Sequence, residues 1–525
     1  MDSSEIIARI KEVLPDFEAL AVSRPYADEV LLKVNPLDFK GTSLALHKIL
    51  SSPVMMLFAC DEREACGIFV IRCVFVDFKN SQWVIVSMDI PEQHAYFDTL
   101  AKSMYSAANF EREIWEMFGI EPKENPDLRR LRLHDEVWPK GDYPLRKDFK
   151  ITQAGNLSDY KFNRVDGEGI FEVPVGPIHA GIIGPGHFRF SLAGEPIVNL
   201  ELRFGFAHRG VEKLFEGKLY ADLLGLAECV SGDSSFAYSL AFAQAAEKIF
   251  GVTIPAKASI LRAIFLELER MHNHVNAIGG MALDAGFSFP HAYASIIKEA
   301  ILQLNEKISG NRYLRKINVI GGVTQDIDEV RKELIVDSLK RIKYDFNELT
   351  KILNSSISFM DRVDTTGVLR KKTAKDLGAV GLVARASGIP MDLRKYFPGI
   401  YDQAKFKISL QESGDVLARL RVRINEFEES CRLIEYFLAK IDKNEGLRSD
   451  FQLKGGSALG YSEGWRGPVL FWLEIGPMGL IKRCKIVDSS FLNWQGLSFA
   501  VIGDIIPDFP LCNKSFDLSY SGNDL

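Results

Sequence analysis

The chain has 525 residues, of which 47% are hydrophobic and 26% are charged, and its formal net charge at pH 7 is −6. This composition is ordinary for a folded globular protein, and the length is sufficient for two or more domains. A general nucleic-acid binder is excluded because both signs of charge are mixed and no basic excess exists. No apolar run approaches the ~18 residues of a membrane-spanning helix, so we expect membrane association only through partners or the protein surface.

The seven cysteines are scattered along the chain, and no two of them have Cys-x-x-Cys spacing. The sequence therefore carries no zinc or iron–sulfur motif of its own. An odd number of scattered cysteines favours a reduced, cytosolic protein in which most thiols are core residues.

The first 150 residues are predicted to form a small α/β domain. Residues 6–14 have helical spacing, and residues 101–118 place apolar side chains at the i, i+3, i+4 positions of an amphipathic helix. Segments rich in Val, Ile, Phe and Trp predict strands over 54–59, 67–78 and 82–88.

Two segments rich in proline and arginine, 125–130 and 143–149, are predicted to be loops. They are either solvated basic surface or extended arms that dock on another subunit. Residues 151–172 are polar and contain glycine, which predicts a linker to a second domain.

Residues 173–525 are predicted to form a mainly helical domain with a minor β part, so the fold class is α+β. Turns and short strands are expected around 176–190. Helices are then expected over 220–249 (interrupted near Gly232), 256–278, 292–308, 326–353, 373–386 and 415–441, which favours a helical bundle. Residues 465–497 return to a strand pattern with a hairpin turn at 476–479, and 508–525 are expected to be a short polar end.

Two blocks of sequence resemble a known family. The first is Phe110–Ile120 (FEREIWEMFGI), followed by Pro126–Arg130 (PDLRR) and Pro144–Asp148 (PLRKD). This series resembles the signature of the 30-kDa (C-type) subunit of respiratory complex I and of its homologues in membrane-bound hydrogenases.

The second block runs from Gly176 to the end and is similar to hydrogenase large subunits and to the 49-kDa (D-type) subunit of complex I. Its matching pieces are Gly176–His179, Gly186–Phe190, His208–Lys213, Leu266–His274, Ala282–Phe287 and Glu463–Gly467. The fused order of the two blocks resembles the large subunit of formate hydrogenlyase and hydrogenase-4 complexes. The resemblance implies domains at 1–150 and 173–525.

In active hydrogenases of this family, four thiolates from two Cys-x-x-Cys motifs hold nickel and iron. The positions of the first motif are Ser231 and Ser234 here, and those of the second are Ser519 and Gly522. Serine and glycine cannot supply soft donors, so we expect no metal site and no cofactor held by this chain itself.

The 49-kDa subunits of complex I have also lost these cysteines, and there the vacated cavity binds a quinone headgroup through a Tyr and a His. The Tyr position aligns with Gly232, and the His corresponds to His187 or His179. Asp284 lies where the family has the Asp that partners this His. The site is therefore neither a complete hydrogenase site nor a complete quinone site.

The resemblance suggests two sets of functional side chains. Proton transfer is expected from His187, Glu228 and Asp284. A small polar cavity for water or a hydrogen-bonding ligand is expected between Ser231, Ser234, Tyr238 and Ser519. The alternative for each is structural: a satisfied histidine, a buried carboxylate paired with arginine, or a tyrosine bonded within the protein.

The resemblance implies an oxidoreductase subunit that acts only within a membrane-associated, complex I-like assembly. An iron–sulfur small subunit with a 4Fe-4S cluster should pack beside the serines, and ion-pumping-type membrane subunits should lie beneath, at the cytoplasmic face of the inner membrane. The first hypothesis is electron transfer from that cluster to a quinone or another small acceptor. The second is a redox-silent scaffold coupled to an ion-translocating membrane module. The third, disfavoured by the missing thiolates, is an active nickel–iron hydrogenase.

Overall fold

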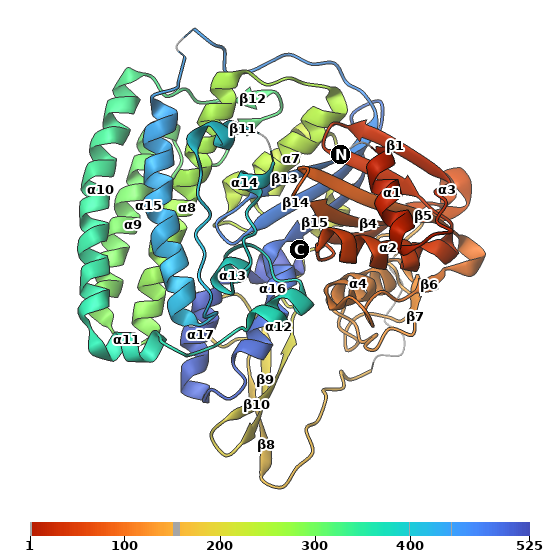
Figure 1. Ribbon diagram of the computed structural model, residues 1–525, viewed down its shortest axis with the longest axis horizontal. Helices are drawn as coiled ribbons and strands as arrows, with labels where there is room; N and C mark the ends of the chain where they lie inside the picture. The colour runs from red at the N-terminus through yellow and green to blue at the C-terminus, as the bar shows by residue number, and fades with distance from the viewer. Residues whose placement is uncertain (1–2, 151–157, 398, 443) are drawn as a thin grey trace.

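The computed structural model describes residues 3–150, 158–397, 399–442 and 444–525. Figure 1 shows a sheet-based N-terminal domain on one side, a layer of long helices on the other, and the C-terminal strands between them. The predicted α+β class, with an N-terminal α/β domain followed by a mainly helical region, is confirmed.

A five-stranded sheet with the order β1-β2-β5-β4-β3 forms the N-terminal domain. β2 and β5 are parallel, and the other neighbours are antiparallel. β3 and β5 are buried along nearly their whole length, which explains their continuous apolar runs. The elements are α1 Ser3–Val13, β1 Ala21–Tyr26, β2 Glu29–Lys33, α2 Pro36–Leu50, β3 Met56–Glu62, α3 Arg63–Cys66, β4 Ile68–Asp77, β5 Gln82–Pro91, β6 Tyr96–Asp98, α4 Ala108–Phe118 and β7 Glu121–Lys123.

The three predicted strands and the first helix of this domain are confirmed, but the helix predicted from residue 101 begins only at Ala108. The physical reason is Glu111, whose buried carboxylate accepts bonds from the Leu100 main-chain N–H and the Thr99 hydroxyl, both at 2.5 Å. These bonds hold residues 99–101 in a turn. The sequence pattern also missed α2, β1 and β2.

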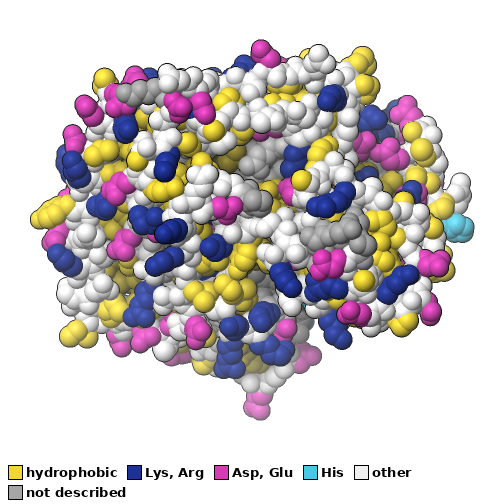
Figure 2. Space-filling model, turned by 45° about the horizontal axis from the view of Figure 1, so that its top comes forward, with side chains coloured by type: hydrophobic (Ala, Val, Ile, Leu, Met, Phe, Trp, Pro, Cys, Tyr) yellow, Lys and Arg dark blue, Asp and Glu magenta, His cyan; other side chains and the backbone are white. Residues whose placement is uncertain are grey.

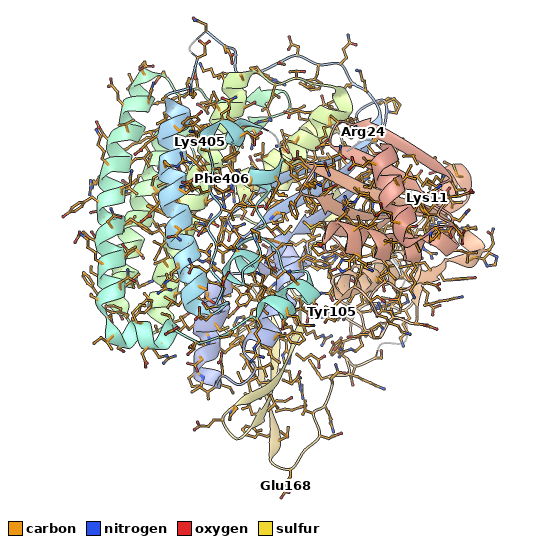
Figure 3. All side chains as sticks on the ribbon, viewed as in Figure 1. Lys11, Arg24, Tyr105, Glu168, Lys405 and Phe406 are labelled. Atoms are coloured by element: carbon orange, nitrogen blue, oxygen red, sulfur yellow. The ribbon has the colours of Figure 1, made fainter. Side chains whose placement is uncertain are left out.

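A three-stranded antiparallel sheet follows, with the order β10-β9-β8. Its strands are β8 Ile170–Val175, β9 His187–Ala193 and β10 Ile197–Arg203. The predicted linker begins with residues 151–157, which lie outside the described residues, and ends at β8 rather than at residue 172. Its later part is held to β10, because the Tyr160 hydroxyl donates to Glu201 at 3.1 Å. Glu168, labelled in Figure 3, lies at the outer tip of the chain that leads from residue 158 into β8.

The predicted helical bundle is confirmed. α8 Ala256–Asp284, α9 Ser288–Ser309, α10 Glu329–Ser355 and α15 Val416–Leu438 lie side by side (Figure 1). The helix expected over 373–386 is two helices, α12 Lys371–Leu377 and α13 Gly381–Ala386, because the chain turns at Gly378 with φ +74°. The remaining elements of this region are α5 Val211–Phe215, α6 Leu224–Glu228, α7 Ser235–Phe250, β11 Asn318–Val319, β12 Gly322–Val323, α11 Ile357–Val363 and α14 Leu393–Tyr396.

The C-terminal hairpin is confirmed as β14 Pro468–Ile475 and β15 Ile481–Asp488, with β13 Gly456–Glu463 completing its sheet. The strand pattern predicted up to residue 497 is wrong, since α16 Ser489–Ala500 follows β15 directly. α16 is buried on nearly all sides and mixes polar with apolar residues, and such a segment has no period that separates helix from strand. The expected polar end is also wrong: α17 Phe509–Phe516 and α18 Tyr520–Asp524 are packed inside, and Leu525 is 2% exposed.

The N-terminal sheet and the C-terminal strands share one hydrophobic core. Phe58 of β3 packs on Trp472 of β14 with ring centroids 5.6 Å apart. At the same boundary the ammonium group of Lys485 is fully buried and bonds to the carboxylates of Glu113 and Glu212. Glu113, which lies in the first motif block, therefore stabilises β15, the strand that precedes the C-terminal helices.

The two basic loops pack on their own chain. The Arg112 guanidinium donates to the carbonyl oxygen of Arg129 at 2.7 Å, and Arg146 donates to that of Phe118 at 2.6 Å. Figure 2 shows charged side chains of both signs interspersed over the visible face. Across the described residues, every helix is too short or too polar to cross a bilayer.

Candidate functional site

The candidate site forms where two segments far apart in sequence meet. One is the turn between α6 and α7, where glycine, serine and aspartate at 231–234 interrupt the helical pattern because such residues favour turns over helix interiors. The other is the segment before α18. It begins at Asp517, whose φ of +54° turns the chain sharply, and continues to Ser519, whose hydroxyl accepts the Gly522 N–H at 2.9 Å and caps α18.

The three serines lie together where these two segments meet. The hydroxyl oxygens of Ser231 and Ser519 are 2.8 Å apart, and Ser231 also donates to the Asp233 carboxylate at 2.8 Å. Ser234 donates to the same carboxylate oxygen at 3.1 Å. We call Ser231, Asp233, Ser234 and Ser519 the serine cluster.

An arginine completes the serine cluster. Arg466 makes a two-pronged ion pair with Asp233, with N–O distances of 2.6 and 2.9 Å, and lies over the Trp465 ring at 3.9 Å. The indole of Trp465 donates to Ser234 at 3.0 Å. Partial burial opposes ionisation of Asp233, but Arg466 and the two hydroxyls outweigh it and hold the pKa of this carboxyl well below its usual range. Arg466 and Trp465 stand in a family-like motif, yet nothing local in the sequence indicated this contact.

Tyr238 does not face a ligand cavity. Its buried hydroxyl donates to the Asp488 carboxylate at 2.6 Å, which is the structural alternative for this residue. The pair lies directly under Gly522: a Cβ atom there would be 2.8 Å from the Tyr238 hydroxyl and 2.9 Å from the Asp488 carboxyl carbon. Burial and the Asp488 charge raise the pKa of Tyr238 well above its usual value, so the hydroxyl keeps its proton.

The residues present do not fit a nickel–iron group. That group needs soft thiolates, whereas the four ligand positions hold three hard hydroxyls and a glycine without a side chain. The hydroxyls of Ser231 and Ser234 donate their protons to Asp233. The side chains of Tyr238 and Asp488 occupy the space beside Gly522. We expect elemental analysis of the isolated chain to find no stoichiometric nickel. One nickel per chain, retained through desalting, would contradict this expectation.

The three predicted proton-transfer residues are not joined to the serine cluster by hydrogen bonds among the described residues. Glu228 accepts the Lys316 main-chain N–H at 2.7 Å, and burial raises its pKa. Burial raises the pKa of Asp284, at the end of α8, and the positive charge of Lys514 opposes this rise. His187 lies 3.4 Å from the Gly176 carbonyl oxygen, and burial lowers its pKa.

The other candidate histidine, His179, lies closer to the serine cluster in the bonding network. Its Nε2 is 3.2 Å from the hydroxyl of Tyr520, the residue next to Ser519. The loop that carries it exposes Ile178 and Ile182 almost completely. The sequence could not choose between His179 and His187; the structure connects His179 to the serine segment.

The long helix α8 supports the site from behind. The Asn273 carboxamide donates to the Asp233 carbonyl oxygen at 2.7 Å, and the Glu269 carboxylate accepts the N–H groups of Phe236 and Ala237 at 2.6 and 3.1 Å. His274 faces away and bonds to Glu426 at 2.9 Å. These polar side chains of α8 fix the start of α7.

Comparisons with known proteins agree with this architecture. Residues 32–154 match the family model of the respiratory-chain NADH dehydrogenase 30 Kd subunit, and residues 284–454 match that of the 49 Kd subunit. Formate hydrogenlyase subunit 5 of Escherichia coli is 30% identical over 482 residues, covering 89% of this chain and 84% of that protein.

Two further relatives cover similar or shorter lengths. Hydrogenase-4 component G of Escherichia coli is 29% identical, covering 89% of this chain and 83% of its own. The C/D 1 subunit of NADH-quinone oxidoreductase from Aquifex aeolicus is 31% identical, covering 66% of this chain and 64% of that protein.

Proposed function

Because this chain belongs to the family of fused 30-kDa and 49-kDa subunits of respiratory-chain NADH dehydrogenase and formate hydrogenlyase-type complexes, we propose that it is an electron-transfer subunit without a nickel–iron centre. A neighbouring iron–sulfur subunit with a 4Fe-4S cluster supplies the electrons. A quinone, or another small acceptor with similar oxygens, takes two electrons and two protons beside the serine cluster and leaves as the quinol.

The observation that carries this proposal is the serine cluster itself. Ser231 and Ser234 donate their hydroxyl protons to Asp233, and a neutral acceptor would receive these protons in exchange for that carboxylate, which keeps its ion pair with Arg466. Ser231, Ser234 and Ser519 would bind the acceptor, while Tyr238 supports the cluster from beneath Gly522. The ion pair is not fully enclosed, since the Asp233 side chain is 39% exposed, and this gives the cluster an open side.

An approach route lies along the loop that carries His179. Ile178 and Ile182 are 87% and 101% exposed, and such side chains suit contact with an apolar ligand tail or a partner subunit. His179 and Tyr520 connect this loop to Ser519. Protons would arrive through His187, Glu228 and Asp284.

The same proposal covers location and assembly. The chain would sit peripherally at the cytoplasmic face of the inner membrane, held by ion-pumping-type membrane subunits. Its relatives from Escherichia coli formate hydrogenlyase and Aquifex aeolicus NADH-quinone oxidoreductase are by name parts of larger complexes, which supports this assignment.

The test is quinone-dependent turnover of the purified intact complex. Ser519→Ala is expected to lower turnover at least about tenfold. It removes a hydroxyl that bonds the Ser231 hydroxyl and also accepts the Gly522 main-chain N–H, which caps α18. His179→Ala and His187→Ala compare the two proposed histidines. Ser295→Ala, on the exposed surface of α9, is the control and should leave turnover unchanged. Absence of quinone-dependent turnover in the wild-type complex, with partner clusters shown to be reducible, would refute the proposal.

A second function, a redox-silent scaffold, is favoured by one observation. The hydroxyls of Ser231 and Ser519 satisfy each other, and these residues are only 2% and 6% exposed. Under this alternative the neighbouring small subunit would also lack its cluster cysteines. Inspection of that subunit's sequence, followed by iron analysis of the complex, decides between the two.

A further inference from the structure

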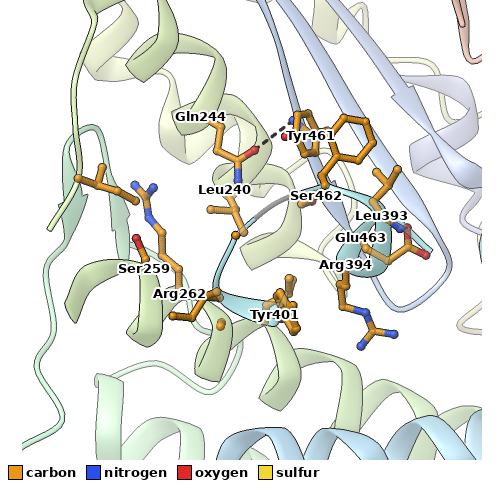
Figure 4. A pocket seen from close by; sticks show the side chains of 16 residues that line it. Leu240, Gln244, Ser259, Arg262, Leu393, Arg394, Tyr401, Tyr461, Ser462 and Glu463 are labelled. Atoms are coloured by element: carbon orange, nitrogen blue, oxygen red, sulfur yellow. Dashed lines mark hydrogen bonds between the residues drawn. The ribbon is translucent and has the colours of Figure 1, made fainter. Parts of the chain in front are cut away.

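A pocket separate from the serine cluster lies beside Glu463, at the start of the short segment that carries Trp465 and Arg466. It has a volume of about 220 Å³ and is bounded by α7, α8, β13 and the chain at 393–397 and 399–401. Glu463 lies in its wall, three residues before Arg466. Figure 4 shows the side chains that surround it.

The charged groups around this pocket are already neutralised. Arg262 forms two bonds to the Glu247 carboxylate, at 2.6 and 2.9 Å. Arg394 pairs with Asp392 and Glu267, and Glu463 pairs with Arg385 at 2.8 Å. A charged ligand would enter a largely apolar space without a counter-charge, which is unfavourable. The pocket therefore selects a neutral molecule.

Most of the wall is apolar, with Leu240, Leu266, Leu393 and Phe397 facing the space. Pockets for drug-sized ligands measure about 300–1,000 Å³, so a volume of about 220 Å³ suits a molecule of one or two rings. Apolar burial would supply most of its affinity.

One side-chain hydrogen-bond donor in this wall has no partner among the described residues. The Gln244 side-chain oxygen accepts the Tyr461 N–H at 3.3 Å (Figure 4), so its amino group stays available as a donor. A ligand oxygen that accepts from this amino group would add a hydrogen bond to the apolar contacts.

We propose that this pocket is a separate binding site for a neutral, mainly apolar molecule of one or two rings that carries a carbonyl-type acceptor. The site is distinct from the serine cluster, although Glu463 and Arg466 lie on one short segment. Arg270 fixes that segment by donating to the carbonyl oxygens of Glu463 and Gly464, at 2.6 and 3.1 Å.

The test is equilibrium binding to the purified full-length chain by calorimetry and saturation-transfer NMR. The probes are 1-tetralone, a neutral bicyclic ketone; tetralin, which lacks the carbonyl; and 1-naphthoate, which is charged. We expect saturable binding of 1-tetralone at one site, with tetralin about tenfold weaker through loss of one hydrogen bond and 1-naphthoate weaker still.

Ser259→Trp places a bulky ring at the wall of the pocket and should weaken 1-tetralone binding at least about tenfold. Ser295→Trp is the matched control, since both serine hydroxyls donate to a carbonyl four residues earlier in the chain. Equal binding of all three probes, no saturation, or equal binding by both variants would overturn the proposal. The wild-type comparison of probes decides the matter even if a variant folds poorly. Binding at equilibrium requires no electron transfer, so failure here and failure of the proposed function are distinguishable.

Discussion

Replacing Lys485 by methionine is expected to lower the free energy of unfolding by about 3–5 kcal/mol, because two buried carboxylates each lose one of their two cations. The ammonium group of Lys485 is 0% exposed and bonds Glu113 of α4 and Glu212 of α5. Urea denaturation followed by tryptophan fluorescence measures the change. Lys482→Met is the matched control on the same strand, since that side chain is 58% exposed, and it should change stability by less than about 0.5 kcal/mol.

The same variant should alter the acid dependence of stability. Burial opposes ionisation of Glu212, but Lys485 and Arg483 outweigh it and lower its pKa to about 2. A carboxyl whose pKa is lower in the folded chain contributes stability above its unfolded pKa of about 4.3, and this contribution is lost as the pH falls toward 2. Lys485→Met moves the folded pKa back upward, so stability should fall less steeply between about pH 5 and pH 2. An unchanged slope would show that Arg483 alone holds Glu212 ionised.

Replacing Gly522 by alanine is expected to destabilise the chain by about 1–3 kcal/mol through overpacking. The added methyl group would lie 2.8 Å from the Tyr238 hydroxyl and 2.9 Å from the Asp488 carboxyl carbon, both held in place by their own hydrogen bond. Gly225→Ala in α6 is the control: no atom lies within 4 Å of its added carbon, and alanine in a helix is neutral or slightly stabilising. Thermal unfolding compares the two.

A double-mutant cycle identifies the cause of that effect. Tyr238→Phe removes the hydroxyl that the new methyl group would meet, so the combined variant should be more stable than the sum of the single effects predicts. Strict additivity would mean that the clash is with Asp488 or the backbone instead. The cycle also bears on the metal question, because a thiolate restored at residue 522 would meet the same pair.

Much of the fold followed from local patterns. Three of the five strands of the N-terminal sheet, the four long helices and the C-terminal hairpin each have a side-chain pattern or a turn signal within a short window. The errors have two causes. α16 mixes polar and apolar residues and is buried on nearly all sides, so it has no clear period. The start of α4 is set by Glu111, whose carboxylate bonds residues 99 and 100.

The candidate site was predictable only in part. The sequence by itself determined that the thiolate positions hold Ser231, Ser234, Ser519 and Gly522, because that is a matter of residue identity. Only the tertiary structure decided how those residues are used. Asp233 and Arg466 are 233 positions apart, and Tyr238 and Asp488 are 250 apart, so no local pattern could reveal either pair. Buried charges and hydroxyls must find partners wherever the fold brings them, and that requirement is satisfied by long-range packing rather than by neighbours in the chain.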